Sequence, residues 1–282
     1  MKLFTNIEIR ELATSLSLKD RIMVLGSCFA DNIGEKLANA GFNVCINPFG
    51  TLYNPASIAS AVARLECGES FTEEDCVMMG AGADLVCSFS HHTKFARKTE
   101  SEFLENANAA LREASDFWKN CTKVIVTFGT ARVWKHNGKV VSNCLKRPAS
   151  EFTGEILSME EIEACLDGME KPDKEYIFTV SPIRHLSDGA HANTVSKATL
   201  LLALDKWLEN HGHSYFPAYE IMMDELRDYR FYAEDLCHPN HTAIELIWEK
   251  FLKAATLDSE ATAIRKNEKD SIRNSHRKIL QK

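Results

Sequence analysis

The stretch RIMVLGSCFADNIGEKL, residues 21–37, carries the pattern that decides the fold. Its first five residues form an apolar run that stops at Gly26, and beyond it Phe29, Ile33 and Leu37 recur every four positions. A short apolar run predicts a buried strand, and a spacing near four predicts a helix with one apolar face. The stretch therefore predicts a strand, a sharp glycine turn and a helix in direct succession.

The same alternation continues along the chain. Further strands are predicted at residues 42–46, 84–89, 123–128 and 176–180, and further helices at residues 55–65, 102–118, 192–209 and 240–252. The run KVIVTF at 123–128 gives the clearest strand, because its β-branched residues end at Gly129. Strands that alternate with helices indicate βαβ units, and hence an α/β fold with a parallel sheet covered on both faces.

The segment lengths predict one α/β domain over residues 1–257 and a charged tail at 258–282. Residues 66–100 and 132–172 are longer than ordinary connections, so we predict that they are insertions that shape a pocket. The tail contains seven Lys and Arg and four Asp and Glu in mixed order. This mixture favours a solvated or partly disordered helix, with a partner-docking helix as the alternative.

Composition excludes several classes of protein. The net charge of −7 over 282 residues argues against a general nucleic-acid binder. No apolar run reaches the ~18 residues of a membrane-spanning helix, and Glu8, Arg10 and Glu11 interrupt what would be the core of a secretory signal. Nine cysteines without a C-x-x-C pair are typical of reduced thiols. We therefore expect a cytoplasmic protein without nucleic-acid or membrane partners. The sequence does not determine its oligomeric state.

Ser27 follows the first predicted strand and its glycine. Ligands bind beyond the carboxyl ends of the strands in an open parallel sheet, and a helix N-terminus favours developing negative charge. The position therefore suits a nucleophilic hydroxyl whose own N–H donates to an oxyanion. The alternative is that Ser27 only caps the helix, a common role for serine. Cys28 is a weaker candidate nucleophile, because consecutive side chains on such a turn diverge.

Asp235 precedes His238 by three residues, immediately ahead of the last predicted helix. Pro239 suits the first helical position, which would place His238 near the N-cap. On such a turn Asp235 can accept the Nδ1 proton of His238 and leave Nε2 free as a base. An Asx turn with a surface histidine is the alternative. Together with Ser27, the two residues predict a Ser-His-Asp triad at one edge of the sheet.

Five blocks of sequence carry a family resemblance: GSCFA (26–30), NPFGTLYNP (47–55), TFGTARVW (127–134), TVSPIRH (179–185) and residues 215–239. In this order the chain resembles the GSCFA-domain family from about residue 20 to residue 252. That family is similar to the SGNH/GDSL hydrolases, whose fold is a flavodoxin-like three-layer α/β/α sandwich with a mostly parallel central sheet. The resemblance implies a serine esterase or acyl-transfer site. No phosphate-binding glycine motif occurs, and we expect no cofactor.

The resemblance also implies roles for single residues. Ser27 matches the nucleophile and first oxyanion donor, and Asp235 and His238 match the orienting carboxylate and the base. Gly50 is the best match to the glycine whose N–H is a second donor.

The third donor of the superfamily is an asparagine after the third core strand, and that position holds Ala131. Loss of one oxyanion donor can cost ~10²–10³-fold in kcat. Thr130 and Asn143 are candidate substitutes.

Two further pairs of residues carry predictions. Arg184 and His185 follow the strand at 176–180, where Arg184 could hold an anionic group and His185 could line the pocket. The alternative is that Arg184 pairs with a carboxylate and braces the loop. His91 and His92 do not predict a metal site, because adjacent side chains on a strand point to opposite faces.

The leading hypothesis is a serine-dependent hydrolase of a small-molecule or carbohydrate ester, which acts through an acyl-enzyme on Ser27. A second hypothesis keeps the same covalent step and passes the acyl group to a sugar hydroxyl. A third, from a different class, is a non-catalytic binding module on the same fold.

Overall fold

The computed structural model describes residues 5–9 and 11–280. Its main sheet has the strand order β10-β9-β5-β1-β2, and every pairing is parallel. Counted along the chain, this is the 2-1-3-4-5 order of flavodoxin-like sheets. The fold prediction is therefore confirmed. The strands are β1 (Arg21–Gly26), β2 (Asn43–Ile46), β5 (Lys123–Phe128), β9 (Glu175–Val180) and β10 (Ser214–Tyr215).

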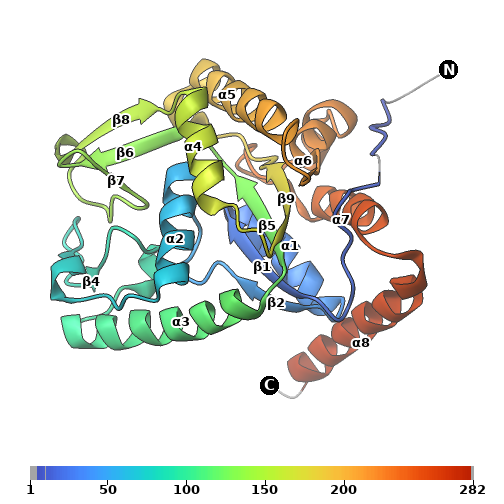
Figure 1. Cartoon of the computed structure of the whole chain (residues 1–282), viewed down its shortest axis with the longest axis horizontal. Coiled ribbons are helices and arrows are strands. Elements are labelled where there is room, and N and C mark those ends of the chain that lie inside the picture. Colours follow the sequence, from blue (N-terminus) through green and yellow to red (C-terminus); the bar gives the residue numbers. More distant parts are fainter. Residues whose placement is uncertain (1–4, 10, 281–282) are drawn as a thin grey trace.

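Helices cover both faces of this sheet (Figure 1). One face packs against α2 (Pro55–Cys67), α3 (Glu100–Asn120), α4 (Met159–Met169) and α5 (Ala190–Leu208). The other packs against α1 (Cys28–Asn39), α6 (Ala218–Glu220) and α7 (His241–Ala255).

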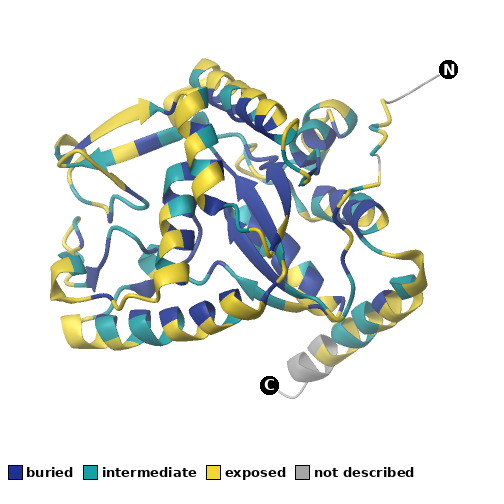
Figure 2. Ribbon diagram, viewed as in Figure 1, coloured by how far each residue is buried: buried dark blue, intermediate teal, exposed yellow. Residues whose placement is uncertain are grey.

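The strands of the main sheet divide their side chains between the two cores. In β1, Met23 and Leu25 join one core and Ile22 and Val24 join the other, because successive side chains of a strand alternate between faces. The centre of the sheet is accordingly buried on both sides (Figure 2).

Two small antiparallel sheets lie outside the main one. The predicted strand at 84–89 is reduced to β4 (Val86–Cys87), which pairs with β3 (Val77–Met78) and not with the main sheet. It ends early because Ser88 begins a turn, in which its carbonyl accepts from the N–H of His91. The second sheet has the order β7-β6-β8 and consists of β6 (Arg132–His136), β7 (Lys139–Val141) and β8 (Phe152–Ile156).

The charged tail forms helix α8 (Ala261–Leu280), which packs against the body of the protein. Ile264 is buried in the core that contains α1 and α7. Trp248 Nε1 donates to Glu268 Oε1 at 2.8 Å, and Asn267 Nδ2 donates to the carbonyl of Ala40 at 2.9 Å. The prediction of a solvated or partly disordered helix was therefore wrong for the face of α8 that carries Ile264, because this face packs against the protein. In the part of the chain that the structure describes, no helix combines the length and apolar character needed to cross a bilayer.

Candidate active site

Ser27 lies at the carboxyl end of β1, beside the end of β5. These two strands are neighbours in the sheet, and the chain leaves them in opposite directions, which is where ligands bind in open α/β sheets. Ser27 is the N-cap of α1: its Oγ accepts from the N–H of Phe29 at 3.3 Å, and its own N–H donates to the carbonyl of Thr127 at 3.2 Å. The residue is fully buried. The capping role is thus present, and the hydroxyl has no contact with solvent in this conformation.

Gly26 is required for the turn into α1. Its φ is +136°, and a Cβ built on it would lie 2.1 Å from the carbonyl oxygen of Thr127. Only glycine combines this backbone conformation with such a close approach of two strands. The glycine turn predicted between the first strand and the first helix is confirmed.

Asn47 holds this turn in place, a role that the sequence reasoning missed. Its Oδ1 accepts from the N–H of Gly26 at 2.8 Å, and its Nδ2 donates to Asp31 Oδ1 at 2.7 Å. Asn47 is buried and has a φ of +41°, a region that asparagine tolerates better than most residues. The signal in the sequence was an asparagine directly after the second strand.

Asn47→Ala is expected to lower the free energy of unfolding by about 1–3 kcal/mol, because the N–H of Gly26 would be left buried without an acceptor. Urea unfolding followed by circular dichroism measures this change. Asn43→Ala is the matched control, since Asn43 is exposed at the start of β2. Equal losses in the two variants would contradict the role given to Asn47.

Asp235 and His238 form the predicted pair. His238 Nδ1 lies 2.5 Å from Asp235 Oδ2, while Asp235 Oδ1 accepts from the N–H groups of Cys237 and His238, each at 2.9 Å. The backbone N–H groups of His238 and Cys237, followed by the His238 side chain, lower the pKa of Asp235 to about 2. The carboxylate is therefore ionised at any working pH, and it directs His238 through Nδ1, which leaves Nε2 on the far side of the ring.

The helix after His238 begins later than predicted. Asn240, and not His238, is the N-cap of α7: its Oδ1 accepts from the N–H of Ala243 at 3.1 Å. Pro239 therefore precedes the helix and does not occupy its first position. His238 belongs to the loop and is about half exposed.

The loop of His238 meets the end of β9. The N–H of Arg184 donates to the carbonyl of Cys237 at 3.1 Å, which ties the segment after β9 to the segment around His238. Ser27 and His238 are thus at the same carboxyl edge of the sheet, because β1 and β9 both flank β5 and end there. Among the described residues no hydrogen bond joins Ser27 Oγ to His238.

The predicted oxyanion donors are already bonded within the protein. The N–H of Gly50 donates to the carbonyl of Asn47 at 2.8 Å, and the N–H of Thr130 donates to the carbonyl of Tyr53 at 2.9 Å. The Thr130 hydroxyl is 2.8 Å from Ser196 Oγ. These groups can serve an oxyanion only after local rearrangement.

Gly50 also has a structural reason to be glycine. Its φ is +86°, and a Cβ there would lie 2.2 Å from the Cβ of His92. Ala131, at the position of the missing asparagine, is fully buried, and its N–H donates to Ser196 Oγ at 2.7 Å. It belongs to the hydrophobic core.

A pocket with an empty volume of about 630 Å³ lies beside this edge. Asn143, His185 and Thr130 line it. Arg184 does not line it: its Nη1 is 3.4 Å from the carbonyl of Leu236, and its guanidinium lies 5.8 Å from the ring of Tyr232. Arg184 therefore braces two loops, as in the alternative prediction. It does so through a backbone carbonyl and an aromatic ring, and not through a carboxylate.

Lys197 of α5 is a buried amine behind the site that the sequence reasoning also missed. Its Nζ donates to the carbonyl of Ser181 at 2.8 Å and lies 5.4 Å from the ring of Tyr219. Burial lowers its pKa to about 7, an effect that the nearby Cys28 opposes. Burial, Lys197 and His238 together lower the pKa of His185 to about 4, so its imidazole is neutral at physiological pH.

Three buried polar atoms at this edge have no hydrogen-bond partner in the described part of the protein: Thr127 Oγ1, Ser181 Oγ and His185 Nε2. Unpaired buried polar groups are rare, and a cluster of them needs an explanation such as bound water or a ligand. His185 Nε2 would lie 3.1 Å from a Cβ at Gly129, so the unpaired nitrogen faces the end of β5.

Lys197→Met is expected to make the stability of the protein less sensitive to a fall in pH. The folded-state pKa of Lys197, about 7, lies below the unfolded value near ~10.4, so between these values the unfolded state binds more protons and stability rises with pH. The charge penalty is complete below pH ~7, and the stability gained by Lys197→Met should therefore be largest at pH 6 and shrink toward pH 10. Urea unfolding at several pH values measures it, with the exposed Lys206→Met as control. A pH-independent difference would contradict the burial of a charged amine.

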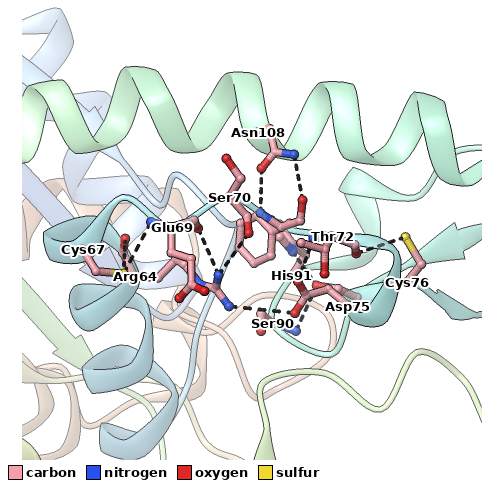
Figure 3. Close-up of polar contacts among 12 residues, drawn as sticks. Arg64, Cys67, Glu69, Ser70, Thr72, Asp75, Cys76, Ser90, His91 and Asn108 are labelled. Carbon is pink, nitrogen blue, oxygen red and sulfur yellow. Dashed lines mark hydrogen bonds and ion pairs between the residues drawn. The ribbon is translucent and has the colours of Figure 1, made fainter.

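His91 and His92 do not converge on a metal ion. His91 is enclosed by the rings of Phe49, Phe71, Phe95 and Phe103, with Nδ1 2.6 Å from Ser88 Oγ, and burial lowers its pKa to about 3. Figure 3 shows it beside the segment from Arg64 to Cys76, where Asn108 of α3 exchanges hydrogen bonds with the backbone of Phe71. His92 caps a short 3-10 turn instead of lying on a strand. In residues 5–9 and 11–280 no group of three or more His, Cys, Asp or Glu side chains is arranged to hold a metal.

A search of curated proteins found no match. The model of the GSCFA family matches residues 21–251, which includes Ser27, His238 and every strand of the main sheet. The chain therefore belongs to the GSCFA family.

Proposed function

We propose that the protein is a serine-dependent ester hydrolase of the SGNH type, with Ser27 as nucleophile, His238 as base and Asp235 as its orienting carboxylate. One observation carries the proposal: an ionised Asp235 holds His238 at 2.5 Å on the sheet edge at which Ser27 begins helix α1. An imidazole fixed through Nδ1 presents Nε2 as a general base.

The proposed reaction has two steps. Ser27 Oγ attacks the acyl carbon as its proton passes to His238 Nε2; the bond to the alcohol oxygen then breaks, and the imidazolium returns the proton to that oxygen. A water molecule, deprotonated by His238, next attacks the acyl-enzyme, which releases the acid and restores Ser27. Asp235 stabilises the imidazolium in both steps.

The reaction requires a conformation more open than the one described here. Ser27 is fully buried, and its N–H and that of Gly50 are bonded to backbone carbonyls. The contact from the N–H of Phe29 to Ser27 Oγ is long at 3.3 Å, so little is lost when the hydroxyl turns away from it. Substrate binding would supply the free energy that opens the site.

Two other functions have specific observations in their favour. Burial of Ser27 and the occupied oxyanion donors favour a non-catalytic binding module. The pocket beside the edge favours transfer of the acyl group to a bound alcohol. For the cellular setting we propose the cytoplasm, with support from the nine cysteines, all of which are free thiols.

A fluorophosphonate probe tests the proposal, because it phosphonylates only activated serine hydroxyls. We expect mass spectrometry of the labelled protein to place one adduct on the peptide that contains Ser27. The Cys28→Ala variant should be labelled to the same extent as the wild type. A folded protein that does not react would support the binding module. Product analysis with and without a sugar acceptor separates hydrolysis from transfer.

A further inference from the structure

Trp134 differs from the other three tryptophans of the chain. Trp118, Trp207 and Trp248 are at most 4% exposed, whereas Trp134 is 39% exposed. Each buried indole donates its N–H to a carboxylate, namely that of Glu66, Asp167 or Glu268. The indole N–H of Trp134 has no partner among the described residues. A tryptophan that is partly exposed and has an unpaired indole N–H is typical of a binding site and not of a hydrophobic core.

The neighbouring strand leaves room for this indole. Trp134 is in the middle of β6, opposite Val141 of β7 and Gly154 of β8. A Cβ at Gly154 would lie 2.9 Å from Trp134 Cζ3 and 3.1 Å from Arg132 Nη1. Gly154 has no positive φ, so its backbone does not need glycine. The lack of a side chain instead makes space beside the ring.

Trp134 lines the pocket that His185 and Thr130 also line. Polar side chains line the same pocket, Asn143 and Asp188 among them. Asp188 Oδ2 is 3.0 Å from Arg132 Nε, so the charges of the pocket are paired. Asn143 uses its Oδ1 for the N–H of Leu145, which leaves its Nδ2 as a donor.

These features select among ligand classes. An aromatic side chain that shares a pocket with paired charges and an amide donor suits a neutral molecule that has one apolar face and a rim of hydroxyls, which is a sugar ring. A phosphate group would need an unpaired cation, and Arg132, the cation that lines the pocket, is paired with Asp188. An acyl chain would need walls that are apolar throughout.

The pocket also lies beside the proposed catalytic edge. Its wall includes His185, whose Nε2 faces the end of β5 and whose pKa is affected by His238. A ring held here would carry an ester on a neighbouring hydroxyl to that edge.

We propose that this pocket binds the sugar ring of an acylated carbohydrate, with the C–H face of the ring stacked on Trp134 and its hydroxyls on Asn143 and the Arg132–Asp188 pair. That the bound sugar is acylated rests on the proposed esterase function. Binding of the sugar ring itself does not depend on that function. Trp134 then determines specificity and is not a catalytic residue.

Kinetics on two esters test the role of Trp134. For Trp134→Ala we expect kcat/KM to fall about tenfold on an O-acetylated methyl glycoside and to stay within about twofold on p-nitrophenyl acetate, which has no sugar to stack. Val140→Ala, an exposed change on the adjacent strand β7, is the matched control and should alter neither. Equal losses on both esters, or no loss on the glycoside, would overturn the inference.

A binding measurement separates this inference from the proposed function. Because Trp134 is the exposed tryptophan, acrylamide quenching of fluorescence reports mainly on it. Methyl glycosides should protect wild type and Ser27→Ala equally from quenching and should have no effect on Trp134→Phe. Protection from quenching in a protein that hydrolyses no ester would support the sugar site and refute the esterase function. Labelling of Ser27 without protection by any glycoside would refute the sugar site alone.

Discussion

Ser27→Ala is expected to lower kcat/KM for p-nitrophenyl acetate by about 10⁴-fold or more and to abolish fluorophosphonate labelling, while the protein remains folded. The loss is large because no acyl-enzyme can form without the hydroxyl. The stability cost should be only about 1 kcal/mol, that of a helix N-cap, and the capping contact of Ser27 is a long one at 3.3 Å. Initial rates and thermal unfolding measure the two effects separately.

Ser158→Ala is the control for the structural part of this change. Ser158 caps α4 in the same way, with Oγ accepting from the N–H of Glu161 at 3.2 Å, but it lies outside the proposed site. This variant should show a similar loss of stability and full activity. Activity retained in Ser27→Ala would show that the residue is a cap and nothing more.

His238→Ala should remove activity to a similar extent, by about 10⁴–10⁶-fold, because Ser27 would lose the base that takes its proton. Stability should change little, since His238 is half exposed and, among the described residues, its side chain bonds only to Asp235, also half exposed. Rates on p-nitrophenyl acetate and urea unfolding measure both quantities.

His241→Ala is the matched control for His238→Ala. His241 is three residues further along, is 85% exposed and pairs with Glu245 at 3.1 Å. Its removal should leave the rate unchanged. If His238→Ala unfolded the protein, or lost no more activity than His241→Ala, His238 would not be a base.

The fold could be predicted because its signals are local. The run at β1, Gly26 and the helical spacing of α1 are contiguous, and strand-helix alternation leaves few sheet arrangements. The pair Asp235 and His238 was also predictable, since a separation of three positions within one turn suffices to place it. Ser27 could be placed at the sheet edge by the same logic.

What could not be predicted depends on contacts between distant segments. Burial of Ser27 results from packing around the ends of β1 and β5, and Ile264 docks the tail through one apolar side chain among many charged ones. Asn47 is tied to Gly26 across 21 positions of sequence. The pattern of a single segment carries no information on these contacts.

The sheet β7-β6-β8 has a consequence for how the family can diversify. Its strands pair only with one another among the described residues, so they share no ladder with the five strands that carry Ser27. Substitutions in these strands can therefore reshape the pocket around Trp134 while the parallel sheet keeps its register. For the proposed enzyme, choice of ligand and bond-breaking chemistry would then evolve on separate parts of the same chain.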